Sequence, residues 1–306
     1  MAYELTGITD WINSKPLTLQ GLKGNVVMVD FWTYSCVNCI RTLPHLISLY
    51  SNYKSRGFVL VGVHSPEFEF EKEAKNIKKA VKDFGIPYPV ANDPEMQTWA
   101  AFNNRYWPGH YLFDKEGRLV ETHFGEGKYA ETENLVRRLL GLNELPAAGT
   151  SSFLKRIFSG SVTPETYCGS DRGPEIGSAA VCLPDASCKY IDQDQHKPGM
   201  LYLDGNWARE PEFLEHRGKE GWLSLVFTAS EANLVMAGKG TIIATIDGKA
   251  LSETESGEDV SFKDKKSVLA VDSPRMYRIF KSMKRETHDL KLMVSGNVQA
   301  FAFTFG

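Results

Sequence analysis

The sequence has few cysteines, no long hydrophobic run and no large excess of either charge. Its first 25 residues are interrupted by Asp10, Asn13, Lys15 and Pro16, so they contain no apolar stretch long enough for a signal peptide or a membrane span. Taken as written, the chain is expected to stay in the cytoplasm. Five cysteines are also too few for a scaffold held together by disulfides.

The charge balance excludes further classes of protein. The 35 Lys and Arg residues nearly match the 38 Asp and Glu residues, and the net charge is -3. The basic residues are scattered among acidic ones, which leaves no basic stripe for nucleic acid or an anionic membrane surface. We therefore predict no nucleic-acid partner. With 42% hydrophobic residues, the composition is that of an ordinary globular protein.

The length of 306 residues is enough for two domains. Residues 145–160 are rich in small and polar residues, which is typical of a linker. We predict one domain over residues 1–144, a linker over residues 145–160, and a second domain over residues 161–306.

The first domain has an α/β pattern. Apolar runs at 26–31 and 58–63 predict two buried strands, and the helical spacing of Ile40, Leu43 and Ile47 predicts a helix between them. A right-handed crossover would make these strands parallel. The remaining predicted elements are a helix from about 65 to Gly85, a hairpin of strands 110–113 and 119–122, and a helix over 135–140.

The second domain shows short strand patterns and no helical period. The predicted strands are 222–228, 232–236, 241–246, 267–271, 276–280, 289–294 and 300–305. Asp247-Gly248 is a good hairpin turn. An antiparallel β-sandwich of the jelly-roll kind is the natural interpretation.

The motif Cys36-Val37-Asn38-Cys39 lies between a predicted strand and a predicted helix. This order places the Cys36 sulfur at a helix N-terminus, where amide groups and the helix dipole stabilise a thiolate. We predict that Cys36 attacks a substrate disulfide and that Cys39 resolves the mixed disulfide. Asp30 is an acid within an apolar strand, where a carboxylate is costly, and is predicted to take the proton from Cys39.

Residues 29–44, Val-Asp-Phe-Trp-Thr-Tyr-Ser-Cys-Val-Asn-Cys-Ile-Arg-Thr-Leu-Pro, resemble the thioredoxin-like domain of DipZ-type proteins, which are relatives of the TlpA and ResA oxidoreductases. Gly205-Asn206-Trp207, Pro274-Arg275-Met276-Tyr277 and residues 300–306 resemble the second module of the same proteins. The resemblance implies a thioredoxin fold followed by a β-sandwich similar to carbohydrate-binding modules. It also implies a thiol-disulfide reductase outside the cytoplasm that receives electrons from a CcdA-like membrane partner.

The thioredoxin fold carries expectations for the substrate groove. Pro108 precedes the predicted strand 110–113, and a proline there is expected to be cis and to lie beside the disulfide. We predict that Trp32, Trp107 and Pro108 contact the disulfide-containing protein substrate. Trp107 departs from the smaller residue usual at its position, which favours a narrower or more aromatic groove. No cofactor and no metal are predicted.

Three alternatives compete with this interpretation. A thiol peroxidase is the nearest, since Thr33 precedes Cys36 by three residues and Arg41 or Arg105 could polarise a peroxide. A metal site would need ligands beyond the Cys-x-x-Cys pair. For zinc, the candidate cysteines are Cys182 and Cys188. For copper, the candidate histidines are His45, His64, His110 and His123. A binding protein could instead use aromatic residues of the sandwich as glycan platforms, namely Trp207, Trp222 and Tyr277.

The remaining cysteines form a second group. Cys182 and Cys188 flank a turn-rich stretch, and a disulfide between them is favoured, which would leave Cys168 free. Pairing of Cys168 with either of the others stays open at this point. The direction of electron flow also stays open, because the motif does not fix a reduction potential.

Overall fold

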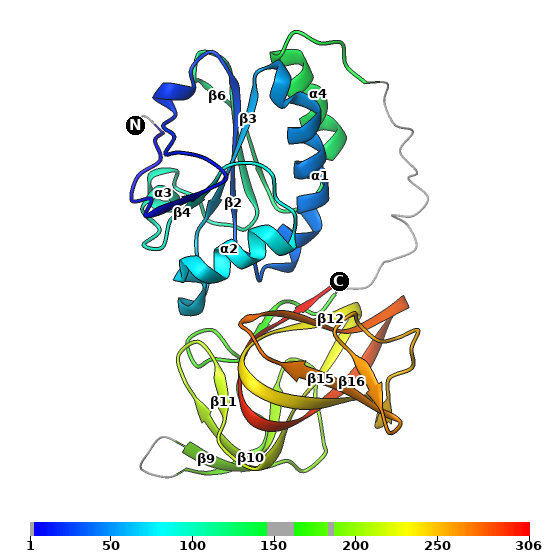
Figure 1. Ribbon diagram of the computed structural model, residues 1–306. Helices are drawn as coiled ribbons and strands as arrows, with labels where there is room; N and C mark the ends of the chain where they lie inside the picture. The colour runs from blue at the N-terminus through cyan, green and yellow to red at the C-terminus, as the bar shows by residue number, and fades with distance from the viewer. Residues whose placement is uncertain (1–2, 146–161, 183–186) are drawn as a thin grey trace. The chain divides into compact units, whose positions relative to one another are not determined.

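The computed structural model describes residues 3–145, 162–182 and 187–306 (Figure 1). The chain divides into two compact units, Met1–Thr150 and Ser151–Gly306. Apart from Leu145, the predicted linker lies outside the described residues. Within the described ranges, no helix has both the length and the apolar character that crossing a lipid bilayer requires.

The first unit is built on a six-stranded sheet of order β1-β4-β3-β2-β5-β6. Its strands are β1 (Asp10–Ile12), β2 (Val26–Trp32), β3 (Phe58–His64), β4 (Val90–Asn92), β5 (Gly109–Phe113) and β6 (Leu119–Phe124). Its helices are α1 (Val37–Tyr53), α2 (Ala74–Asp83), α3 (Gln97–Ala101) and α4 (Tyr129–Leu139), with 3-10 turns at Gln20–Leu22, Lys54–Arg56 and Glu69–Lys72. Strands β2, β3 and β4 are parallel, as the crossover rule predicted for the first two, and β5 and β6 form the predicted hairpin.

Both faces of this sheet are covered. On one face, α1, α2 and α4 pack through residues such as Leu43, Ile77 and Val136. On the other, the N-terminal segment and the region of α3 pack on Val29 and Phe31. Because every residue of β2 is buried, the strand is a nearly continuous apolar run. Asp30 is the exception, and it lies on the face covered by α1.

The predicted helix from about residue 65 was wrong in its first part. Residues 65–73 form a loop and the 3-10 turn Glu69–Lys72, and α2 begins only at Ala74. The reason lies in Glu71, whose buried side chain accepts hydrogen bonds from the backbone N–H groups of Glu67 and Phe68. These bonds hold the chain in a tight loop that a regular helix could not form.

The second unit is all-β, as predicted. Its 10-stranded sheet contains β7 (Thr166–Tyr167), β8 (Ala179–Cys182), β9 (Ser187–Ile191), β10 (Leu201–Arg209), β11 (Leu214–His216), β12 (Glu220–Ile246), β13 (Lys249–Ala250), β14 (Ser261–Lys263), β15 (Lys266–Val271) and β16 (Arg275–Phe305). Within its described residues, these strands pair antiparallel, and Asp247-Gly248 joins β12 to β13 as expected.

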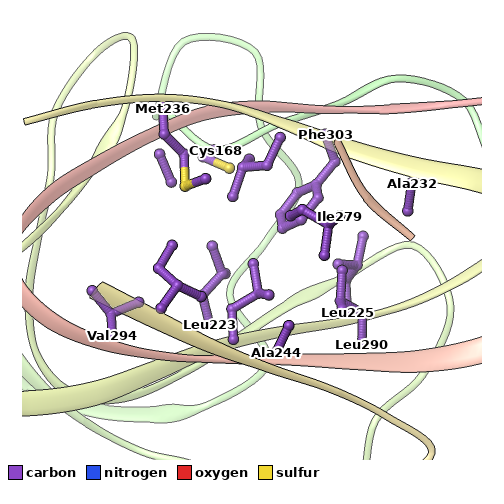
Figure 2. Packing of buried hydrophobic residues seen from close by; sticks show 14 of the residues in the cluster. Cys168, Leu223, Leu225, Ala232, Met236, Ala244, Ile279, Leu290, Val294 and Phe303 are labelled. Atoms are coloured by element: carbon purple, nitrogen blue, oxygen red, sulfur yellow. The ribbon is translucent and has the colours of Figure 1, made fainter. Parts of the chain in front are cut away.

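Two long strands replace six of the predicted short ones. The predicted strands 222–228, 232–236 and 241–246 are parts of β12, and 276–280, 289–294 and 300–305 are parts of β16. The two strands pair with each other repeatedly, with register shifts between Ala229 and Ala237 of β12. Residues 290–295 of β16 pair with both ends of β12, so bending at these shifts lets one strand border the core twice. Figure 2 shows this core, with Cys168, Met236 and Phe303 among its buried side chains.

Candidate active site

The two cysteines of the motif have different surroundings. Cys36 is the N-cap residue of α1 and is partly exposed, and its Sγ accepts the backbone N–H of Cys39 at 3.4 Å. Cys39 lies one turn into the helix and is only 1% exposed. An accessible sulfur at a helix N-terminus is suited to nucleophilic attack, and a buried neighbour is suited to the second step.

Cys39 requires a base before it can attack. Burial raises the pKa of its thiol well above the usual value, and the neighbouring Cys36 and the charge of Asp30 raise it further. A thiol in this state keeps its proton at neutral pH. The geometry therefore calls for a proton acceptor close to Cys39.

Asp30 is the carboxylate that is placed to act as this proton acceptor. It lies on β2 with Gly62 of β3 and His110 of β5 as its register partners, and it is 1% exposed. Its Oδ1 lies 3.2 Å from Nε2 of His110, which is ion-pair distance. The angles do not make a hydrogen bond, and neither carboxylate oxygen has such a partner among the described residues. An available buried carboxylate fits the predicted role.

Gly62 makes room for polar groups beside Asp30. A Cβ at this position would lie 3.0 Å from Nε1 of Trp32 and 3.1 Å from the ring of Tyr88. The Trp32 Nε1 and the Tyr88 hydroxyl are both buried without a hydrogen-bond partner in the described chain. Burial raises the pKa of Tyr88, and the charges of Asp30 and Cys39 add to the effect. These groups thus surround Asp30 and Cys39 with unused hydrogen-bonding capacity.

A second polar layer supports the loop before Cys36, and sequence reasoning missed it. Nε2 of His64 lies 3.3 Å from the Thr33 hydroxyl and accepts the N–H of Tyr34. The Ser35 hydroxyl donates to Glu71 at 2.5 Å. Burial lowers the pKa of His64 to about 3, so this imidazole is neutral and can accept. The layer fixes three consecutive residues that lead into the nucleophile.

Glu71 is the titratable member of this layer. Burial raises its pKa to about 7, although the hydrogen bonds from Ser35 and Thr33 act in the opposite direction. Its carboxyl oxygens join the loop of Cys36 to the loop after β3. The sequence contains one weak indication of this role, because Glu71 is an acidic residue within a stretch whose pattern predicts a helix.

The peptide bond between Trp107 and Pro108 is cis, as predicted. Nε1 of Trp107 donates to the Ser65 carbonyl at 3.0 Å, and its ring lies 4.2 Å from that of Trp99. These contacts fix the loop against the end of β3. Tyr106 and Phe124 are exposed next to it, with ring centroids 5.4 Å apart. The surroundings of Pro108 are thus aromatic.

Trp32 was predicted to contact substrate, and this is wrong. Its side chain is fully buried, in edge contact with His64 at 5.2 Å. The alternation of β2 turns it to the same covered face as Asp30. The Thr33 side chain is buried as well, and its hydroxyl lies 3.3 Å from Nε2 of His64.

Two of the three proposed glycan platforms are also wrong. Trp207 and Tyr277 are 0% exposed and belong to the core of the second unit. Their polar atoms bind backbone, since Nε1 of Trp207 donates to the Asp204 carbonyl and the Tyr277 hydroxyl donates to the Ser273 carbonyl. Trp222 is only partly buried, and Nζ of Lys291 lies 4.2 Å from its ring centre.

A group near Trp222 has ligand types that metals use. Ligand atoms of Asp192, Asp194 and His196 lie within 4.8 Å of one another. Both imidazole nitrogens of His196, however, contact carboxylates: Nε2 lies 2.9 Å from Asp192 and Nδ1 lies 2.7 Å from Asp289. Burial opposes a charge here, but the two carboxylates raise the pKa of His196. Both ring nitrogens of His196 are thus occupied by carboxylates.

The disulfide between Cys182 and Cys188 is present, as predicted, and joins β8 to β9. Cys168 is free and fully buried, and burial raises its pKa far above the usual value. It therefore packs as a small apolar side chain.

The chain is similar to several known proteins. Residues 4–122 match the AhpC/TSA family, and residues 163–306 match the thioredoxin like C-terminal domain. DipZ of Mycobacterium bovis is 33% identical over 312 residues, covering 100% of this chain and 43% of DipZ. The thiol-disulfide oxidoreductase YkuV of Bacillus subtilis is 29% identical and covers 46% of this chain and 95% of YkuV. A crystallised thioredoxin-like superfamily protein is 26% identical with a TM-score of 0.43, covering 47% of this chain and 98% of its own.

In fold and in site, the first unit is similar to thiol-disulfide oxidoreductases such as YkuV and ResA. The chain as a whole is a homologue of DipZ, to which it is similar along its full length and in the order of its two units. It spans less than half the length of that relative.

Proposed function

We propose that this chain reduces disulfides in proteins, with Cys36 as nucleophile, Cys39 as resolving thiol and Asp30 as proton acceptor. The observation that carries the proposal is the contrast within the motif. Cys36 is accessible at the start of α1, whereas Cys39 is buried, keeps its proton and lies near a buried carboxylate.

The reaction has two exchange steps. The Cys36 thiolate attacks one sulfur of the substrate disulfide, forming a mixed disulfide and releasing the other sulfur as a thiolate. Asp30 then takes the proton of Cys39, whose thiolate attacks Sγ of Cys36. The Cys36–Cys39 disulfide forms, the second substrate thiolate leaves, and two electrons have passed to the substrate. Trp107 and Pro108 form the wall along which the extended substrate lies.

The test of this function measures insulin reduction with dithiothreitol as the electron source. We expect wild-type protein to accelerate it, Cys36→Ser to abolish the acceleration, and Cys39→Ser to accumulate a mixed disulfide with substrate. Cys168→Ser is the matched control, because that thiol is buried in the core of the second unit. Consumption of hydrogen peroxide at a catalysed rate, without insulin reduction, would instead establish the peroxidase that the AhpC/TSA match allows.

We also propose that the protein works outside the cytoplasm and receives electrons from a CcdA-like membrane partner. Similarity to DipZ over the full chain supports this, since more than half of DipZ lies beyond the matched part. A reductase fed in this way needs a reducing Cys36–Cys39 pair. A measured potential near -120 mV, at the oxidising end of the superfamily range of about -270 to -120 mV, would contradict it.

For the second unit we propose a carbohydrate ligand, as the resemblance to carbohydrate-binding modules suggests. Trp222 is the remaining aromatic candidate, because Trp207 and Tyr277 are buried in the core. Glycan-array binding that Trp222→Ala removes, and Trp207→Phe leaves intact, is the expected result. Absence of binding to any glycan would leave the unit without this role.

A further inference from the structure

Asp30 is buried on every side, which raises the question of how its proton reaches solvent. After Cys39 has attacked, Asp30 holds its proton, and it must be deprotonated before the next turnover, either by returning the proton to Cys39 as the disulfide is reduced or by passing it toward solvent. Its closest titratable neighbour is His110, at 3.2 Å, whose side chain is only 8% exposed. A route to the surface must therefore continue beyond His110.

Two further histidines lie around His110. His123 is its register partner on β6, with ring centroids 5.9 Å apart. His45 of α1 is close enough for the charge of His110 to act on it, and its own ring stacks on Tyr129 at 4.5 Å. Both are partly exposed, in contrast to His110. The three imidazoles thus lead from a buried carboxylate toward the surface.

Their hydrogen-bonding state is unusual for buried groups. Nε2 is buried in each of the three rings, and in the described chain none of these atoms has a hydrogen-bond partner. Buried polar atoms are normally paired with protein or with internal water, so three such atoms close together favour a water-bridged path. At His196, by contrast, both ring nitrogens lie within hydrogen-bond distance of carboxylates.

We propose that His110 receives the proton of Asp30 and passes it to His123 or His45, which release it to solvent. This rests on the proposed reduction of disulfides through Cys39. One proton moves in each turnover: from Cys39 to Asp30, then to an imidazole nitrogen of His110, and onward. His110 acts through Asp30 and touches no reacting sulfur, so it is a positioning and relay residue.

The pH dependence of the relay is set by the groups around it. Asp30 faces His110 from β2, His45 from α1 and His123 from β6; Glu133 lies beside His45, and Glu121, Glu126 and Lys128 lie beside His123. Burial lowers the pKa of His45 and of His123, and the charge of His110 lowers both further. Neutral imidazoles at the outer end are able to accept a proton at neutral pH.

The relay is tested by separating the two exchange steps. Reduced protein is mixed with a peptide disulfide, quenched in acid, alkylated and analysed by mass spectrometry across pH. In His110→Gln we expect Cys36 to form the mixed disulfide at the wild-type rate, whereas resolution by Cys39 slows by about tenfold and loses its pH dependence. Asp30→Asn should slow resolution more, by about 100-fold, and adding His110→Gln to it should have no further effect. His216→Gln, at a buried histidine of the second unit, is the control.

A second variant guards against misfolding. The double variant His45→Ala with His123→Ala removes both exits, so it should slow resolution, and added imidazole should restore it, which a structural role would not allow. Two outcomes would overturn the relay. One is resolution at the wild-type rate and with the wild-type pH profile in His110→Gln and in this second variant. The other is a rate loss in the Asp30→Asn, His110→Gln double variant that equals the product of the two single rate losses. Failure of the wild-type protein to form any Cys36 mixed disulfide would instead overturn the proposed function.

Discussion

At the scale of single residues, the active site depends on acids placed where water does not reach them. A carboxylate in an apolar interior is costly unless other groups compensate, and Asp30 lacks hydrogen bonds from the described chain. Its value lies in its position, since its charge acts on the buried thiol of Cys39. Glu71 shows the opposite arrangement, with several donors on one carboxyl.

Glu71 should make stability depend on pH. Its pKa in the folded chain is raised to about 7 from 4.5, so folding favours the protonated form. This contribution is fully present below about pH 4.5 and is lost as pH rises through 7, on the order of 3 kcal/mol. Glu71→Gln has no group that titrates at this position, so it should not lose this stability as pH rises. The difference in free energy of unfolding between Glu71→Gln and wild type should therefore change between about pH 4.5 and pH 7.

Urea unfolding at pH 4.5, 6 and 8 measures the difference. Glu69→Gln is the matched control, since that side chain is largely exposed. A constant difference between Glu71→Gln and wild type at all three values would show that the carboxyl keeps one protonation state throughout.

Site residues could be predicted where the signal lies within one short stretch of sequence. Residues that meet the site only through the pairing of distant strands or loops could not. The motif identified Cys36 and Cys39, and the apolar strand around Asp30 made that acid conspicuous. His110 becomes a partner of Asp30 only because β5 pairs with β2. Glu71 was hidden in a stretch whose charges suit a helix. Aromatic residues such as Trp207 gave no indication of which way their strand would turn them.

At the scale of elements, long strands were the main surprise. Sequence patterns break β12 at polar residues near 229–231 and at the glycines near 238–240, and each break predicted a separate strand. The chain instead bends and keeps its hydrogen bonds through register shifts. The short elements β1, β4 and α3 were missed because three to five residues give too little periodic signal.

Gly238 is required at one of these bends. It has a φ of +94°, and a Cβ there would lie 2.3 Å from the carbonyl oxygen of Asn297 on β16. Gly238→Ala should therefore destabilise the second unit by about 2 kcal/mol or more, since both the backbone conformation and the space exclude a methyl group. Gly248→Ala has a positive φ but nothing within 4 Å, so it should cost less. Thermal unfolding measures the stability of the two variants. Equal losses of stability would contradict the steric clash argued for Gly238→Ala.

At the scale of the whole molecule, the two units have separate cores and separate chemistry. The residues of the active site all lie between Asp30 and Phe124, and the core of the second unit uses none of them. Redox chemistry and any binding by the β-domain are therefore carried by different parts of the chain.

This separation predicts that residues 1–145 retain insulin reduction when expressed alone. We expect a specific activity within about twofold of the full chain, because an unchanged active site leaves the activation barrier almost unchanged. Activity toward insulin and toward a glycosylated disulfide substrate should be measured for both forms. An inactive but folded fragment would show that the second unit contributes to catalysis itself.

The C-terminal strand has a consequence for how the protein is made. All six strands of the first unit are available once synthesis has passed Phe124, so that unit can fold while later residues are still being added. The second unit is different, because residues 300–305 of β16 pair with β12 and supply Phe303 and Phe305 to its core. Residues 232–236 of β12 pair with residues 275–280 on one edge, but their other edge stays open until residues 300–305 are made. During that interval the nascent β-domain exposes an unpaired strand edge, which is prone to aggregation.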